Sequence, residues 1–229
     1  MRMVTSQLVV CLALAMTEPT APQNANSTIY VVTYIDIQQN SVNSGIALVQ
    51  RYREATRAEK GALNVEVAQE SGRPNRFAIL ELWKDEEAFE THEKAGRTTQ
   101  FRSELKAIHN SPYDQRVHRG LAMDARPLVA GRGILSVVTH VDVPPPRREE
   151  TEVLLRRSAE DSRKEDGNVR YDIFQQTAPR TNHFTVFVEW KDRKAFEAHE
   201  MKSQTRQFRE ALASMLGAPY DERLYTPLN

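Results

Sequence analysis

Cysteine is almost absent from this sequence, and so is net charge. The 229 residues include a single cysteine, Cys11, which excludes an intramolecular disulfide and the cysteine clusters of zinc or iron–sulfur sites. The 31 lysines and arginines balance 31 aspartates and glutamates, so bulk electrostatics gives no reason to expect a nucleic-acid or acidic-membrane partner. A small neutral or apolar ligand suits this composition better.

Sequence motifs for cofactor chemistry are also missing. The chain contains no nucleophile motif, phosphate-binding loop, dinucleotide fingerprint or metal-ligand spacing. Hydrolase, kinase and flavin- or nicotinamide-dependent functions therefore have no support. The sequence predicts neither a cofactor nor a metal site.

The start of the chain differs from the rest. Its apolar run, Leu8–Met16, is too short to cross a bilayer, but it follows Arg2 and precedes the low-complexity stretch Thr17–Ser27, which is the order of an export signal. Residues 1–28 are therefore expected to be a signal peptide and leader. The mature protein is then periplasmic or secreted, without membrane contact after processing. The alternative is a disordered start on a cytoplasmic protein.

Most of the chain is an internal repeat. Residues 33–37 (TYIDI) recur as residues 139–143 (THVDV), an offset of 106 residues (139 − 33), and one extra residue in a later turn makes the offset 107. Residues 77–92 and 184–199 then agree at eight of sixteen positions. This agreement indicates a duplicated domain.

The repeat sets the predicted domain boundaries. The two copies are expected at residues 29–119 and 133–229, separated by a linker, residues 120–132, which contains two glycines and a proline and lacks a sustained period. Period and turn signals give each copy the order βαββαβ, which is the split βαβ arrangement. In the first copy the predicted strands and helices are 29–37, 41–60, 63–69, 76–84, a helix from Asp85 that breaks near Gly96, and 113–119.

One sheet face of such a unit stays uncovered by its own helices. The face carrying Val31, Thr33 and Ile35, or the alternate face, can be buried most simply against the equivalent sheet of the other copy. The chain is therefore expected to form an intramolecular pseudo-dimer, which could still pair with a second chain.

The stretches Trp83–His92 (WKDEEAFETH) and Trp190–His199 (WKDRKAFEAH) resemble the strand-to-helix signature of the antibiotic biosynthesis monooxygenase (ABM) family. In that signature an aromatic residue ends a strand, an Asp caps the helix, and Ala-Phe-x-x-His follows. The resemblance spans residues 29–119 and 133–226. It implies an α+β fold in which tandem ferredoxin-like domains form a dimeric α/β barrel, with a ligand pocket between sheet and helices.

Family resemblance alone does not fix the activity. Known activities of the family include cofactor-free oxygenation of hydroquinone-like and polyketide aromatics, haem degradation, and isomerisation of small signalling sugars. These activities imply a small-molecule substrate, with dioxygen as the second reactant in the oxygenases.

His92 and His199 are the candidate catalytic bases. Each lies three residues after a phenylalanine, Phe89 or Phe196, on the helix face that meets the sheet, where an imidazole can take a phenolic proton near neutral pH. Cofactor-free oxygenation needs such a base, because a phenolate reduces dioxygen more readily than the phenol does. The alternative is a structural histidine that caps the helix break near Gly96.

Aromatic side chains are the candidate substrate contacts. Trp83 and Trp190, together with Phe89 and Phe196, could stack on a planar substrate. The alternative is that they are core residues, as large aromatics at strand ends commonly are.

Polar residues near the end of the first strand of each copy are weaker candidates. Asp36 and Asp142 could hydrogen-bond a substrate hydroxyl, although a role as turn or cap partner is the stronger reading.

The two copies differ close to these positions. Tyr34 is replaced by His140, and Glu81, on the tryptophan face of its strand by period-2 alternation, is replaced by Val188. Glu81 offers the first copy a second base, so the pockets are expected to be unequal and the first copy to be the more active. The alternative is drift after duplication that leaves at least one pocket purely structural.

Together these features favour a cofactor-independent monooxygenase that oxidises a small hydroquinone-like or polyketide aromatic with dioxygen. A non-catalytic protein that sequesters a small aromatic is the alternative, and an isomerase is a weaker one. Haem degradation is also weaker, because that branch of the family uses a first-strand Asn and a later helix His where this chain has Thr33, Thr139, Phe101 and Phe208.

Overall fold

The computed structural model describes residues 27–126 and 133–228. The predicted export signal and the second half of the predicted linker lie outside these residues. Within the described ranges, no helix combines the length and the apolar composition needed to cross a bilayer.

Each copy folds in the predicted βαββαβ order, with the second helix divided in two. The first copy contains β1 (Ile29–Asp36), η1 (Gln39–Ser41), α1 (Val42–Arg57), β2 (Ala62–Glu70), β3 (Arg76–Trp83), α2 (Glu86–Glu93), α3 (Gly96–Lys106) and β4 (Asp114–Ala122). The second copy contains β5 (Leu135–Asp142), η2 (Pro145–Arg147), α4 (Arg148–Ser162), β6 (Asn168–Gln176), β7 (His183–Trp190), α5 (Arg193–Glu200), α6 (Ser203–Ala213) and β8 (Asp221–Pro227).

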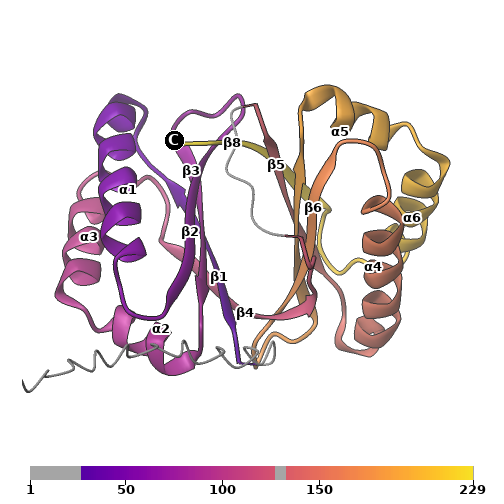
Figure 1. Cartoon of the computed structure of the whole chain (residues 1–229), viewed down its shortest axis with the longest axis horizontal. Helices are drawn as coiled ribbons and strands as arrows, with labels where there is room; N and C mark the ends of the chain where they lie inside the picture. The colour runs from indigo at the N-terminus through magenta and orange to yellow at the C-terminus, as the bar shows by residue number, and fades with distance from the viewer. Residues whose placement is uncertain (1–26, 127–132, 229) are drawn as a thin grey trace, which may run out of the picture.

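The eight strands close into one antiparallel barrel in the order β1-β3-β2-β8-β5-β7-β6-β4. The copies join at two seams, where β2 pairs with β8 and β4 pairs with β6. Helices α1 to α3 cover one side of the barrel and α4 to α6 cover the opposite side (Figure 1). The predicted fold class, tandem ferredoxin-like domains forming an intramolecular dimeric α/β barrel, is confirmed.

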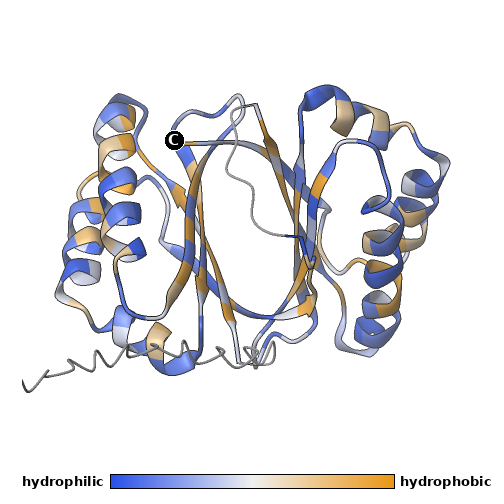
Figure 2. Ribbon diagram, in the orientation of Figure 1, coloured by the Kyte–Doolittle hydropathy of each residue, from blue (hydrophilic) through white to orange (hydrophobic). Residues whose placement is uncertain are grey.

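Strand alternation divides the apolar side chains between two environments. In β1, Ile35 packs in the core beneath the helices, whereas Tyr30 and Val32 point into the barrel and meet Phe174 and Phe187 of the second copy. The two copies therefore bury the β1 face that carries Tyr30 and Val32 against each other, and not the face that carries Val31, Thr33 and Ile35. Apolar residues accordingly follow both the strands and the inner sides of the helices (Figure 2).

A glycine follows the first long helix of each copy, a few residues beyond the C-cap residues Ala58 and Arg163. Gly61 and Gly167 have φ of +93° and +84°, a conformation that L side chains rarely adopt. A Cβ atom there would also come within 2.6 Å of Ala88 or 2.7 Å of Ala195. Both glycines thereby allow the following helix, which carries the candidate histidine, to pack closely.

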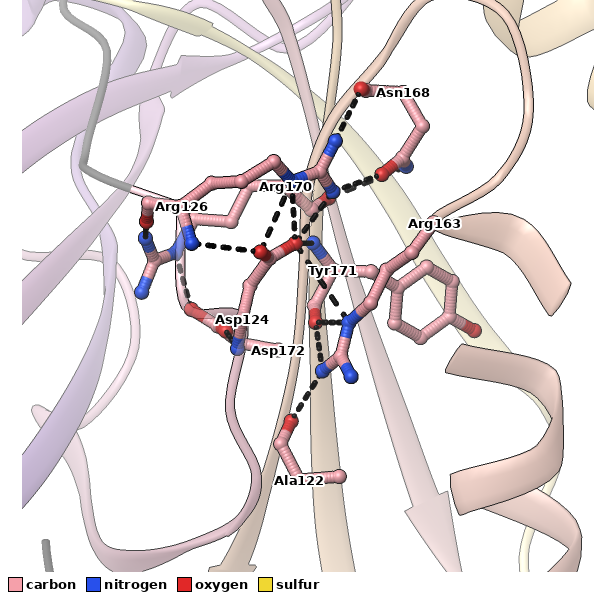
Figure 3. Close-up of polar contacts among 8 residues, drawn as sticks. All are labelled: Ala122, Asp124, Arg126, Arg163, Asn168, Arg170, Tyr171 and Asp172. Atoms are coloured by element: carbon pink, nitrogen blue, oxygen red, sulfur yellow. Dashed lines mark hydrogen bonds and ion pairs between the residues drawn. The ribbon is translucent and has the colours of Figure 1, made fainter. Parts of the chain in front are cut away.

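The first part of the predicted linker is anchored on the second copy. Strand β4 continues to Ala122, past the predicted domain end at residue 119, because it pairs with β6. Beyond it, the backbone N–H of Asp124 donates to Asp172 Oδ1 at 2.7 Å, and the guanidinium of Arg126 donates to the Asn168 carbonyl at 2.8 Å (Figure 3). These contacts fix the way in which the chain crosses from one copy to the other.

Candidate active site

A histidine and a tryptophan lie between sheet and helices in each copy. The side chains of Asp85 and Asp192 accept hydrogen bonds from the backbone N–H of Ala88 and Ala195, so both aspartates cap their helices as predicted. This start places the histidine in the last turn, against the tryptophan that ends the preceding strand. Ring centroids lie 4.6 Å apart for Trp83 and His92 and 4.8 Å apart for Trp190 and His199.

Both copies share a glutamate whose carboxylate contacts Nδ1 of the histidine. Nδ1 of His92 lies 3.1 Å from Glu59, and Nδ1 of His199 lies 3.1 Å from Glu165. A carboxylate at this place holds the imidazole in one orientation and stabilises the imidazolium when the ring takes a proton. It also leaves Nε2 as the nitrogen that faces the sheet side of each chamber.

In the first copy, Tyr52 of α1 occupies the space in front of that nitrogen. Its hydroxyl lies 2.9 Å from His92 Nε2 and donates to Glu81 Oε1 at 2.5 Å. The Tyr52 ring stacks on Phe101 with centroids 4.0 Å apart, and the indole N–H of Trp83 donates to the other oxygen of Glu81 at 3.0 Å. Tyr52, Glu81 and His92 are all buried, and His92 is 0% exposed.

Burial is the largest influence on the pKa of the titratable groups Glu81 and Tyr52 in this chamber. Burial raises the pKa of Glu81, while the neighbouring His92 and the hydrogen bonds from Tyr52 and Trp83 oppose that rise. Burial and the adjacent Glu81 also raise the pKa of Tyr52. The tyrosine therefore keeps its proton and acts as a packing and hydrogen-bonding group.

The second copy has Ser158 at the position of Tyr52 and Tyr171 at the position of Val65, so a strand tyrosine instead of a helix tyrosine borders the space in front of the histidine. A cavity of about 30 Å³ remains there, lined by Trp190, Phe196, His199 and Ser158 among others. Its far wall includes Tyr171, whose hydroxyl lies 3.2 Å from Ser158 Oγ and whose pKa burial raises to about 12. The His199 side chain is 13% exposed, whereas that of His92 is 0% exposed.

A groove of about 200 Å³ between α4 and α6 adjoins this cavity. Ser158, Thr205 and Phe208 line both spaces. In the first copy, Phe101 at the position of Phe208 is buried against Tyr52. The second copy thus combines an outer groove with an inner cavity at its histidine.

The second chamber carries its own carboxylate on a different strand. Glu222 of β8 stands where the first copy has Gln115, and it accepts hydrogen bonds from Arg209 at 3.0 Å and Tyr220 at 3.0 Å. Val188 stands where the first copy has Glu81. The strand carboxylate of the chamber therefore comes from β3 in the first copy and from β8 in the second.

The family assignment follows from sequence comparison together with this architecture. The sequence profile described as "Antibiotic biosynthesis monooxygenase" matches residues 28–109 and again residues 134–211. The chain belongs to the antibiotic biosynthesis monooxygenase family. The tandem match confirms the resemblance read from the two tryptophan-to-histidine stretches.

Individual relatives are consistent with this membership. "Putative monooxygenase YcnE" of Bacillus subtilis is 30% identical over 82 residues, which cover 36% of this chain and 85% of YcnE. A crystal structure described as a putative monooxygenase from Fusobacterium nucleatum has a TM-score of 0.77 at 17% identity, covering 89% of this chain and 93% of that one. Another, described as a putative monooxygenase from Lactobacillus acidophilus, has a TM-score of 0.69 at 13% identity, covering 88% and 94%.

The family match and the Bacillus subtilis relative support a monooxygenase-type function in general terms. The two crystal structures share the fold over nearly their whole length. ABM folds are typically dimeric barrels that act on small molecules, and here one chain supplies both halves of the barrel.

The structure divides the sequence-predicted site residues of this ABM-family chain into two groups. The helix-side group gathers at the two histidines and consists of Glu81, Trp83, Phe89, His92, Trp190, Phe196 and His199. The barrel-side group consists of Tyr34, Asp36, His140 and Asp142, and it lies on the other face of the strands. The structure does not bring the second group to either histidine chamber.

Several chamber residues were missed by sequence reasoning. Glu59 and Glu165 are equivalent across the repeat, two residues before Gly61 and Gly167, and this recurrence was an available signal. Tyr52 was assigned only to the apolar face of its helix. Its exchange for Ser158 was visible in the repeat, but nothing in the spacing indicated that its hydroxyl reaches His92.

Proposed function

We propose that this chain is a cofactor-independent monooxygenase that oxidises a small hydroquinone-like or polyketide aromatic with dioxygen, and that the second chamber is its working site. The observation that carries the proposal is the exchange of Tyr52 for Ser158. It leaves one histidine covered by a phenol side chain and the other facing a cavity.

Tyr52 indicates how a phenolic ligand would lie. Its ring packs on Phe101, and its hydroxyl meets Nε2 of His92 at 2.9 Å. In the second copy, Tyr171 of β6 replaces Val65, and its hydroxyl lies 3.2 Å from Ser158 Oγ, so only about 30 Å³ stays open beside His199. A free phenol could place its ring against Phe208 and its hydroxyl against His199 when Tyr171 turns away from Ser158. Phe208 lines both the groove and the cavity, so a change of its rotamer would join the two spaces.

The chemistry assigned to this site begins with proton transfer. His199 Nε2 takes the proton of the substrate hydroxyl, and Glu165, 3.1 Å from Nδ1, stabilises the imidazolium. The phenolate then reduces dioxygen. For a hydroquinone, one oxygen atom enters the ring, the other leaves as water, and the product is a hydroxyquinone, so that atoms and electrons balance without a further reductant.

This assignment differs from the sequence-based expectation, which favoured the first copy because Glu81 stands beside Trp83. Glu81 is engaged by Tyr52 and Trp83, and both of its oxygens accept hydrogen bonds within the closed chamber. To meet a substrate, Glu81 would have to give up one of these hydrogen bonds. The geometry supports His199 as the base and gives His92 a structural role.

The test is oxygen uptake by the purified full-length chain across a panel of hydroquinones and anthrols. We expect uptake above the spontaneous rate with at least one compound, and loss of that uptake in His199→Ala. Binding of these compounds without oxygen uptake would replace the proposal with the sequestration function. If no compound of the panel is bound and none is oxidised, both the monooxygenase function and the sequestration function are contradicted.

A further inference from the structure

Two histidines and an aspartate gather on the barrel face, away from both histidine chambers. His140 and Asp142 belong to β5, and His183 is the direct cross-strand partner of Asp142 on β7. Val141, between the first two, packs in the helix-side core, so its neighbours point to the opposite face of the sheet. The cluster is therefore separate from the site proposed above.

The three groups approach one another without hydrogen-bonding. His140 Nε2 lies 2.8 Å and His183 Nδ1 lies 2.5 Å from the same oxygen, Asp142 Oδ1. All three atoms lie within 4.8 Å of one another. Yet Asp142 Oδ1 and His183 Nδ1 are buried atoms that have no hydrogen-bond partner among the described residues. Their close approach is therefore not that of a hydrogen-bonded triad.

A chain of hydrogen bonds indicates which nitrogen of His140 carries the proton. His118 Nδ1 faces the Tyr30 carbonyl at 3.3 Å and must donate to it, so Nε2 of the neutral ring accepts from the Thr185 hydroxyl at 3.0 Å. The Thr185 oxygen is then free to accept from His140 Nδ1, 3.5 Å away. His140 consequently presents the lone pair of Nε2 to Asp142.

A lone pair that faces an anionic oxygen at 2.8 Å is repulsive unless a cation lies nearby. The equivalent place in the first copy has such a cation, because Arg76 Nε lies 2.9 Å from Asp36 Oδ2. In the second copy that arginine is replaced by His183. The exchange removes a fixed positive charge and supplies an imidazole nitrogen instead.

Two arginines lie near the cluster, and among the described residues neither forms an ion pair with Asp142 within 4.0 Å. Arg116 forms two hydrogen bonds with Asp114, at 3.1 and 2.7 Å, and Arg223 forms two with Asp221, at 2.9 and 2.6 Å. Each of these guanidinium groups is thus paired with its own carboxylate, and Asp142 in addition helps to raise the pKa of Arg116 from a longer distance. The carboxylate of Asp142 instead lies between the imidazoles of His140 and His183.

We propose that His140 Nε2, Asp142 Oδ1 and His183 Nδ1 bind one divalent first-row transition metal ion. Two imidazoles and one carboxylate form a ligand set that suits zinc, cobalt or iron and leaves coordination positions open. Metal–ligand bonds of about 2.0–2.2 Å require only small side-chain adjustments from the present distances. The ion would join β5 to β7 at the end of the barrel, where the first copy uses an ion pair.

The surroundings supply the outer partner that a ligating histidine needs. Thr185 orients His140 through Nδ1, and His118 orients Thr185 in turn. The ligand side chains of His140, Asp142 and His183 are 12%, 23% and 19% exposed. An ion can therefore enter from solvent and still be largely enclosed by protein.

The experiment uses the full-length chain, treated with a chelator, desalted, and titrated with Co²⁺ and with Zn²⁺. We expect one ion per chain, with Co²⁺ giving visible d–d absorption bands and Zn²⁺ displacing it. Zn²⁺ should also raise the melting temperature, because a ligand that binds only the folded state stabilises it.

The first copy provides the matched variants. His183→Arg restores the ion pair seen at Asp36, so it should fold well and lose metal binding, and Asp142→Asn should lose it as well. Thr185→Val should weaken binding about 10- to 100-fold, the usual cost of removing an outer partner. His109→Ala, in an exposed turn of the first copy, and His199→Ala should leave Co²⁺ binding unchanged.

Circular dichroism without metal shows whether each variant is folded. The proposal is overturned if the wild-type chain binds no Co²⁺, or if folded His183→Arg and Asp142→Asn bind it with wild-type stoichiometry and affinity. The proposal is also overturned if Zn²⁺ raises the melting temperature of His183→Arg as much as that of the wild type.

Discussion

The hydroxyl oxygen of Tyr52 lies 2.9 Å from Nε2 of His92, so the first copy holds a phenol of its own against the histidine that its family signature predicts. The second copy keeps the histidine, its carboxylate partner and its tryptophan, but has Ser158 in place of the tyrosine. The first copy therefore fills its chamber with a side chain of α1, whereas the second copy keeps a cavity of about 30 Å³ beside its histidine.

Closing the second chamber should abolish activity without unfolding the chain. Ser158→Tyr combined with Tyr171→Val reproduces the pair that the first copy has, Tyr52 and Val65, beside the equivalent histidine and phenylalanine. We expect oxygen uptake to fall to the spontaneous rate while the melting temperature changes little. Ser158→Ala, which removes only the hydroxyl, is the matched control and should keep most of the activity. Retained turnover in a folded Ser158→Tyr/Tyr171→Val chain would place the reaction elsewhere.

The reciprocal change tests the structural role of Tyr52. Tyr52→Ser removes a buried ring that stacks on Phe101 and leaves Glu81 with one hydrogen bond fewer. A large-to-small change of this kind costs about 3–5 kcal/mol of unfolding free energy. Denaturant titration of Tyr52→Ser and Tyr52→Phe separates the cost of the cavity from that of the hydroxyl. Equal stability of Tyr52→Ser and wild type would contradict this role.

The two histidines should respond differently to removal. His199→Ala should lower turnover by roughly 10²- to 10⁴-fold, which is typical of losing a general base. His92→Ala should instead lower stability, because Tyr52 and Glu59 lose a buried partner. Steady-state kinetics and thermal melts on both variants check this difference. Equal kinetic losses would indicate two equivalent sites, and a larger loss from His92→Ala would restore the first copy as the working one.

The repeat made the architecture predictable, and the reason is physical. Two units of identical order each expose an apolar sheet face, and a barrel is the arrangement that buries both faces and leaves no open edge. The sequence could not show which face is shared, since Val31 and Val32 are equally apolar. Nor could it show that β4 continues through Gly120, because that extension depends on pairing with β6.

The site was predictable only where its residues are close in sequence. Trp83 and His92 are fixed by one strand-to-helix turn, so their contact follows from local structure. The contact of Tyr52 with His92 joins positions 40 residues apart and depends on how α1 packs on α2. The cluster of His140 and His183 likewise depends on the register between β5 and β7, which no ligand spacing in the sequence reveals.

The barrel interior contains a carboxyl group that makes stability depend on pH. Burial and the nearby Glu66 raise the pKa of Glu189 to about 8, and one of its oxygens has no hydrogen-bond partner among the described residues. The folded state therefore binds a proton more tightly than the unfolded chain, whose glutamate titrates near 4.5. Stability is greatest below that value and falls, by up to about 1.4 kcal/mol per pH unit, as pH rises toward 8.

Replacing Glu189 should remove most of this dependence. Glu189→Gln cannot ionise, and Glu189→Leu installs the residue that the first copy has at this position, Leu82. We expect both variants to unfold at a higher temperature than wild type at pH 9 and to differ least from it near pH 4.5. Melting curves across that range check the prediction. A constant difference at all pH values would mean that Glu189 does not titrate as described.

The first copy expressed alone should not remain a monomer. Residues 27–126 would expose the edges of β2 and β4, which pair with β8 and β6 in the full chain, together with interior side chains such as Tyr30 and Val32. Because β8 is the repeat equivalent of β4, and β6 that of β2, two such fragments can form both seams with each other and close the same barrel. We expect a homodimer, or aggregation where closure fails, in sedimentation and light-scattering measurements. A stable monomer at micromolar concentration would show that burial between the copies is not needed for folding, since the fragment would then tolerate two open edges and an uncovered apolar face.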